Sequence, residues 1–218
     1  KMSVHNIRDF GAVGDGVTLD TAAIQRAIDA CGAGGGGRVL VPAKGIYLSG
    51  TFTMRSHVEL YIERGAVIEA SGDLTDYQYV QTAESHKGVG YPNLRESVTF
   101  IAANDCEDIA FSGGGVIDGG GRKFIVEELP HIYRMQPQRP FTAVLIGCTN
   151  VTFQDIVVRD GAMWTLRLSG CEDVLIQGIR ILNDLKLPNS DGIDIDQCRN
   201  VRIANCHIVA GDDCICMK

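Results

Sequence analysis

Several features are missing from this sequence, and each absence narrows what the chain can be. No apolar run approaches the eighteen residues or more of a membrane-spanning helix. The cysteines form no CxxC pair, which argues against a structural zinc site. Acidic residues outnumber basic ones, 27 to 20, and the net charge is −7. This argues against a nucleic-acid-binding protein, which would carry a basic face. An anionic substrate is still compatible with this charge, because a binding site needs only local positive charge.

The remaining composition is that of a globular protein. The 218 residues are 45% hydrophobic and 22% charged, which is enough to bury a sizeable core within one domain. We therefore expect residues 1–218 to form a single domain. Eight cysteines are many for a chain of this kind, and we expect most of them to be small buried apolar residues.

An internal repeat is the strongest signal in the sequence. Each copy reads cysteine, polar residue, Asp or Asn, β-branched residue, any residue and apolar residue, and the copies begin at Cys106, Cys148, Cys171 and Cys198. Successive copies are 42, 23 and 27 residues apart, and the last two spacings are typical of solenoids. The first spacing leaves room for one coil and an insertion.

Short stretches with an alternation of apolar and other residues precede and follow each cysteine, as in Leu166–Leu168 and Ile193–Ile195. Each coil therefore holds several short strands, and no helical pattern separates them. This arrangement predicts an all-β chain, a parallel β-helix. An array of unrelated hairpins is the alternative, but it would not need a cysteine at the same point of each repeat.

Two segments do not follow the repeat, one before it and one inserted within it. Asp20 is a candidate helix N-cap, and the following residues 21–31 place Ile24, Ala27, Ile28 and Cys31 on one face. We expect this helix to cover the open N-terminal end of the solenoid. Residues 121–140 lack a β pattern and carry Arg122, Lys123, Arg134 and Arg139, so we expect a loop that leaves the coil on one side.

Three carboxylates are predicted to meet on neighbouring coils. Residues 191–195 align with residues 213–217, an offset of 22 residues or about one coil, so Asp191 and Asp213 stack ~4.8 Å apart with Asp212 beside them. Crowded carboxylates cannot all be ionised, and a protonated one beside an ionised one is the acid and base pair of glycoside hydrolysis. A solvated acidic turn or a calcium site is the alternative, although Asp191, Asp194 and Asp196 lack EF-hand spacing. For Asp194 and Asp196 we favour a structural role or substrate contact.

Residues 188–194 and 211–214 resemble the first two signature motifs of the polygalacturonases, glycoside hydrolase family 28. Residues 6–16, 116–119 and 164–166 resemble bacterial members as well, so the resemblance extends over nearly the whole chain. It implies a right-handed, pectin-lyase-like β-helix that hydrolyses pectic polysaccharides or oligogalacturonides with inversion, without metal or cofactor. By this resemblance Asp212 is the general acid, and Asp191 with Asp213 activates water. The candidates for substrate contact are Asn189, Asp194, Lys186 and Trp164.

The sequence also departs from the family pattern. The later Gly-His-Gly and Arg-x-Lys motifs are absent, and Ser190 stands where many members have Thr. We expect the chain to be the N-terminal portion of such an enzyme, truncated at its C-terminal end, whose open coil could bind a second copy. The resemblance implies a secreted or periplasmic protein. A catalytically impaired β-helix that binds glycans or serves as an assembly module is the alternative function, and a calcium-dependent pectate lyase is a weaker third one.

Overall fold

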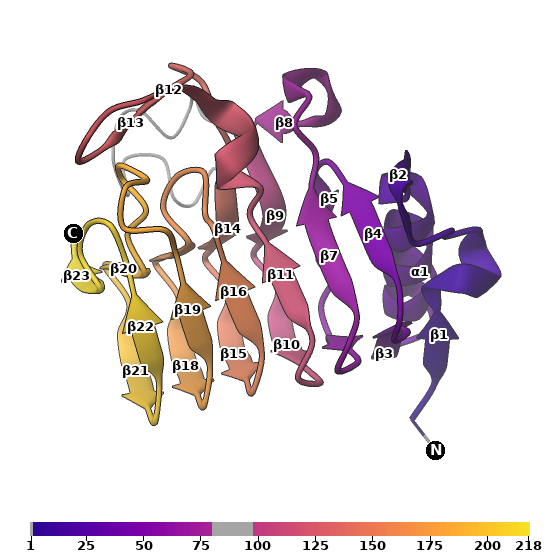
Figure 1. The fold of residues 1–218 in the computed structure, drawn as a ribbon. Helices are drawn as coiled ribbons and strands as arrows, with labels where there is room; N and C mark the ends of the chain where they lie inside the picture. Colours follow the sequence, from indigo (N-terminus) through magenta and orange to yellow (C-terminus); the bar gives the residue numbers. More distant parts are fainter. Residues whose placement is uncertain (1, 80–97) are drawn as a thin grey trace.

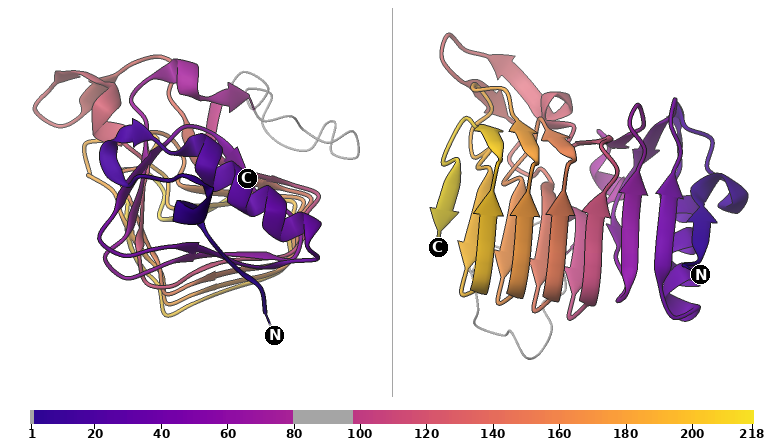
Figure 2. Two further views of the ribbon diagram at one scale, coloured as in Figure 1. Left: turned by 90° about the vertical axis from the view of Figure 1, so that its right-hand side faces the viewer. Right: turned by 90° about the horizontal axis from the view of Figure 1, so that it is seen from below.

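The computed structural model describes residues 2–79 and 98–218 as a right-handed parallel β-helix. Figure 1 shows the coils side by side along the chain, and Figure 2 shows them superposed when seen along the helix axis. Three parallel sheets form the walls, and the chain adds a strand to each of them in turn. Right-handed connections are the rule between parallel strands. The predicted fold class is confirmed. None of the described helices is long and apolar enough to cross a membrane.

The strands of the three sheets are short and in register. The first sheet contains β1 (Val4–Asn6), β3 (Gly37–Val41), β6 (Val58–Ile62), β10 (Glu107–Ser112), β15 (Thr149–Gln154), β18 (Glu172–Gln177) and β21 (Arg199–Ala204). The second contains β2 (Asp15–Leu19), β4 (Ile46–Ser49), β7 (Val67–Ala70), β11 (Val116–Asp118), β16 (Val157–Arg159), β19 (Arg180–Leu182) and β22 (His207–Val209). The third contains β5 (Phe52–Thr53), β9 (Val98–Asn104), β14 (Phe141–Ile146), β17 (Leu166–Ser169), β20 (Ile193–Asp196) and β23 (Ile215–Met217), with β8 (Gln78–Tyr79) antiparallel to β9.

The cysteine repeat marks one corner of the coil. The thiol of Cys171 donates to the carbonyl of Leu145 on the preceding coil, and Cys148 and Cys198 make the equivalent bonds. A cysteine at this point thus links each coil to its neighbour while it stays buried or half-buried. The Asp or Asn two residues later has a left-handed backbone in all four copies, with φ between 53° and 56°, a conformation that these two residue types adopt more readily than most.

The α-helix α1 (Thr21–Ala33) lies across the N-terminal end of the coils, as Figure 2 shows. All four residues of its predicted apolar face are buried in the same core as the strands: Ile24, Ala27, Ile28 and Cys31. Asp20 stands at the N-cap position, but its carboxylate does not cap the helix. It accepts instead from the backbone amides of Val13 and Gly14, at 2.7 and 3.0 Å, and so fixes the preceding turn.

Residues 121–140 leave the coil as predicted, but they are not an irregular loop. They form a 3-10 turn, η5 (Gly121–Phe124), and an antiparallel hairpin of β12 (Ile125–Glu128) and β13 (Tyr133–Met135). Further 3-10 turns, η1 (Ile7–Phe10) and η2 (Leu74–Asp76), occur nearer the N-terminus. Most hairpin residues are exposed on both faces. The sequence therefore lacks the alternation of apolar and polar residues from which a strand could be predicted.

Candidate active site

Asp191, Asp212 and Asp213 come together just before the last two strands of the third sheet, β20 and β23. Strands β20 and β23 pair in parallel with Ile193 opposite Ile215, which is the predicted offset of 22 residues. The amide of Gly192 donates to the carbonyl of Asp213 at 2.8 Å, so the two aspartates are neighbours in the ladder. One carboxylate oxygen from each of the three residues lies within 4.8 Å of the others. Asp191 is buried, whereas Asp212 and Asp213 are exposed.

Two glycines allow the backbone to approach this closely. A Cβ atom at Gly192 would lie 2.4 Å from the carbonyl oxygen of Cys214, on the neighbouring coil. A Cβ atom at Gly211 would lie 2.5 Å from the carbonyl oxygen of Leu187. Both distances are shorter than any real contact, so a side chain at either position would push the Asp212–Asp213 turn away from Asp191.

Buried polar side chains fix the loop that carries Asp191. The Ser190 hydroxyl donates to the Leu187 carbonyl at 2.7 Å and accepts from the amide of Gly211 at 3.1 Å. It therefore links the loop before Asp191 to the turn that carries Asp212 and Asp213. The Asn183 side chain donates to the Thr165 hydroxyl and to the Ser190 carbonyl, each at 2.8 Å. Ser190 was noted in the sequence only as a departure from the usual Thr, and Asn183 was missed because its partners lie on different coils.

Asp194 forms a second layer beneath Asp191. As the alternation predicts, its side chain points away from the interior that Ile193 and Ile195 face, but it is fully buried rather than solvated. The Lys218 ammonium lies 3.1 Å from Asp194 Oδ1 and 3.3 Å from Asp191 Oδ2. It also lies 4.2 Å from the centre of the Trp164 ring. Trp164 and Asp194, both predicted to contact substrate, are thus buried against the ammonium that also contacts Asp191.

Burial and like charge raise the pKa values of both inner carboxyls. Burial, and to a smaller extent the charge of Asp191, raises the pKa of Asp194 to about 7, although Lys218 and Arg167 oppose the shift. Burial and the charge of Asp212 raise the pKa of Asp191, again against Lys218. For Lys218, burial alone would lower the pKa, but Asp194 and Asp191 raise it well above its usual value. The site therefore combines carboxyls that differ in their affinity for a proton.

The raised pKa of Asp194 predicts a pH-dependent stability. Between pH 4 and 7 the folded chain keeps a proton on Asp194 that the unfolded chain, with a pKa of 3.8, has released. The folded state then binds more protons, so the free energy of unfolding falls as pH rises, by up to about 1.4 kcal/mol per pH unit from this group. Asp194→Asn should remove this part of the slope in urea unfolding at pH 4.5 to 7. Parallel profiles for the wild type and the variant would contradict the assignment.

The third layer is an ion pair between Asp196 and Arg167. The Arg167 side chain is completely buried, and its Nη2 lies 3.1 Å from Asp196 Oδ2. Its guanidinium stacks on Trp164 at 4.9 Å from the ring centre. Asp194 and Asp196, which alternate along β20, thus each have a cationic partner, Lys218 directly after β23 and Arg167 on β17.

Asn189 stands at the rim of the site, exposed and with a left-handed backbone (φ 55°). Its side-chain oxygen accepts from Arg139 Nη2 at 2.8 Å, while Arg139 Nε donates to the carbonyl of Ala162 at 2.6 Å. Arg139, which lies just beyond the hairpin, therefore orients Asn189. No sequence pattern indicates this contact, since the two residues are 50 positions apart.

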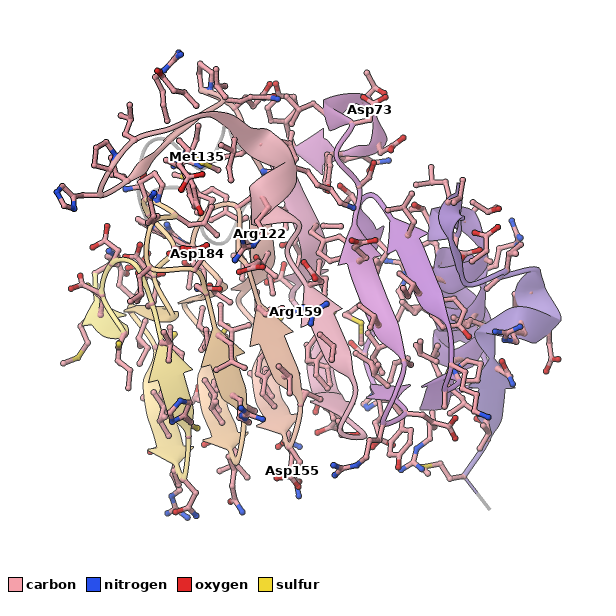
Figure 3. All side chains as sticks on the ribbon, viewed as in Figure 1. Asp73, Arg122, Met135, Asp155, Arg159 and Asp184 are labelled. Carbon is pink, nitrogen blue, oxygen red and sulfur yellow. The ribbon has the colours of Figure 1, made fainter. Side chains whose placement is uncertain are left out.

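Lys186 lies between the site loop and the hairpin. Its ammonium is 2.7 Å from Glu128 Oε1 and 4.9 Å from the centre of the Tyr133 ring. Close by, Arg122 pairs with Asp184 at 2.8 Å, and Figure 3 shows these two residues between the hairpin and the stacked strands. These contacts fasten the hairpin to the loop that carries Asn189 and Asp191. A substrate could bind Lys186 only by competing with Glu128.

The chemistry open to the three carboxylates is proton transfer or cation binding. Three oxygens within 4.8 Å of one another could touch one cation. A calcium ion takes six to eight oxygen ligands, however, and three residues supply only part of such a set. One buried and two exposed carboxyls, by contrast, are what an acid and base pair requires, because different environments separate their proton affinities.

Comparisons with known proteins agree with this geometry. The family model described as "Glycosyl hydrolases family 28" matches residues 31–218. A "Probable polygalacturonase" from Vitis vinifera is 33% identical over 218 residues, which cover 96% of this chain and 43% of that protein. An "Exo-poly-alpha-D-galacturonosidase" from Dickeya chrysanthemi is 26% identical, over 97% of this chain and 41% of that protein. The chain thus spans less than half the length of these curated relatives.

Solved structures show the same fold. The family 28 exopolygalacturonase of Yersinia enterocolitica superposes with a TM-score of 0.81 at 26% identity, over 100% of this chain and 45% of that one. The hyperthermoactive exopolygalacturonase of Thermotoga maritima gives a TM-score of 0.82 at 26% identity, over 99% and 54%. The family model matches most of the chain, and the solved exopolygalacturonases share its β-helix. Both findings confirm the resemblance noted in the sequence. The chain belongs to glycosyl hydrolase family 28.

Proposed function

We propose that this chain hydrolyses galacturonan-type α-linkages in pectic polysaccharides or oligogalacturonides. The observation that carries the proposal is the convergence of one buried and two exposed carboxylates, with oxygens within 4.8 Å, on adjacent coils. The names of its family relatives support the substrate class. Because such polymers occur outside the cytoplasm, we also propose that the protein is secreted or periplasmic.

In the proposed reaction Asp212 is the general acid, which protonates the oxygen of the leaving sugar. Asp191 and Asp213 are ionised and accept a proton from the attacking water. Both exposed carboxyls can reach a substrate on the surface, whereas Asp191 is buried beside Lys218, whose positive charge favours its ionised form. Asn189 contacts the substrate at the rim, where Arg139 holds it in place.

Release of reducing sugars from polygalacturonate tests the proposal. The 218-residue chain should release them, and Asp212→Asn should lower the rate by about 10²–10⁴-fold, the usual contribution of a general acid. A neutral polysaccharide serves as the control substrate, and binding of an oligogalacturonide by the variant shows that its site is intact. Equal background rates from the two proteins would overturn the proposed hydrolysis.

We further propose that the reaction inverts the anomeric configuration, as the resemblance implies. The spacing of the oxygens is shorter than the ~6.5–9.5 Å that usually separates the carboxyls of inverting enzymes. The stereochemistry therefore needs a direct measurement. Proton NMR of the first product should show the anomer opposite to the substrate linkage, and retention would contradict inversion.

A further inference from the structure

Lys218 makes three contacts beneath the acidic residues. Its ammonium lies 3.3 Å from Asp191 Oδ2, 3.1 Å from Asp194 Oδ1 and 4.2 Å from the centre of the Trp164 ring. Only 16% of its side chain is exposed. A charge with so little contact with water interacts strongly with its neighbours. The aromatic face stabilises the ammonium further and limits where it can lie.

The two carboxylates depend on this cation. Asp194 is fully buried, and its Oδ1 contacts the Lys218 ammonium at 3.1 Å, whereas its Oδ2 has no hydrogen-bond partner within residues 2–79 and 98–218. Asp191 Oδ2 accepts from Lys218, whereas Asp191 Oδ1 is buried and has no hydrogen-bond partner among the same residues. A buried charge without a partner is costly, so the ion pairs with Lys218 are what allow Asp191 to remain charged at this position.

We propose that Lys218 is a positioning residue, which orients the Asp191 carboxylate toward the attacking water and keeps it ionised while Trp164 holds the ammonium. The inference rests on the proposed hydrolysis, in which Asp191 is a base. The groups that face Lys218 are Asp191 and Asp194 at contact distance, Asp212 beside Asp191, and Cys216 on β23, two residues earlier in the chain; Arg167 lies against the same indole. Lys218 thus contacts both buried acids.

The pH dependence of kcat/KM on polygalacturonate is the first test. Lys218→Met should move the acidic limb toward higher pH by at least about one unit, since an opposite charge at this distance lowers a carboxyl pKa by about 1–3 units. At a pH on the acidic limb this is a loss of about tenfold or more. Lys218→Arg keeps the charge and should restore most of the wild-type profile. Arg38→Met is the matched control, because it removes a cation that pairs with Glu59 at 2.7 Å and lies over the Tyr61 ring, on strands β3 and β6 of the first sheet.

A second measurement does not depend on activity. In carbon-13 NMR of Asp-labelled protein, with signals assigned through Asp191→Asn and Asp194→Asn, Lys218→Met should raise the titration midpoint of Asp191. Lys218→Arg should leave it close to that of the wild type. Unchanged midpoints or an unchanged acidic limb in Lys218→Met would overturn the positioning role. If the midpoint moves but no variant and no wild-type protein hydrolyses polygalacturonate, the proposed function fails and the role of Lys218 in fixing the charge of Asp191 stands.

Discussion

Replacing Asp191, Asp212 and Asp213 with Asn is expected to lower kcat on polygalacturonate by about 10²–10⁴-fold for each residue alone and by little more for all three together. The three carboxyls act on a single water and a single leaving oxygen, so the loss of one makes the others ineffective. Initial rates for the three single variants, the three double variants and the triple variant measure this. Losses that multiply from one variant to the next would show that the residues act independently.

The same substitutions should not weaken the fold. Asn keeps the size of Asp and removes a charge, and at Asp191 the charge is buried and its pKa raised. The thermal midpoint of Asp191→Asn should therefore equal or exceed that of the wild type, a trade of stability for activity that is common at active sites. Asp9→Asn, at an exposed position near the N-terminus, is the matched control and should change neither rate nor midpoint. A variant that loses activity and midpoint together would point to a structural role.

Repetition explains why the main features could be predicted from the sequence. In a solenoid each residue lies above the residue one coil earlier, so an offset along the chain is also a position in space. That is how the 22-residue offset placed Asp191 beside Asp213, and how the four copies of the cysteine repeat indicated stacked coils. The same rule pairs Cys216 on β23 with Asp194 on β20, and it places Lys218, directly after β23, next to Asp196. Lys218 could have been found by this signal.

Contacts outside the repeat could not be predicted in this way. The hairpin of β12 and β13 has no counterpart on another coil, so nothing in the sequence indicated that Glu128 would meet Lys186 or that Arg139 would meet Asn189. Alternation along β20 likewise gave the direction of Asp194 and Asp196 but not their burial. A strand pattern shows on which face of the sheet a side chain lies. Whether that face is buried depends on residues elsewhere in the chain that pack against it.

The largest effect on stability is expected at Arg167. Its side chain is fully buried against Asp196, which is 5% exposed, so Arg167→Met would leave a buried carboxylate without its cation. Such a break costs about 3–5 kcal/mol. Urea unfolding at neutral pH measures the loss. Arg199→Met is the matched control, because it removes a pair with Glu172 in which the arginine is 77% exposed, and an exposed pair contributes about 0–1 kcal/mol.

A double variant distinguishes the cost of an unpaired charge from the loss of packing. If the unpaired Asp196 is the cause, Arg167→Met with Asp196→Leu should recover most of the stability, since apolar residues of similar volume often replace a buried pair without penalty. If the arginine mainly fills space against Trp164, the double variant should be as unstable as the single one. The first result is expected, because Met retains much of the apolar volume of the arginine stem whereas Asp196 has no second cationic side chain within 4 Å among residues 2–79 and 98–218.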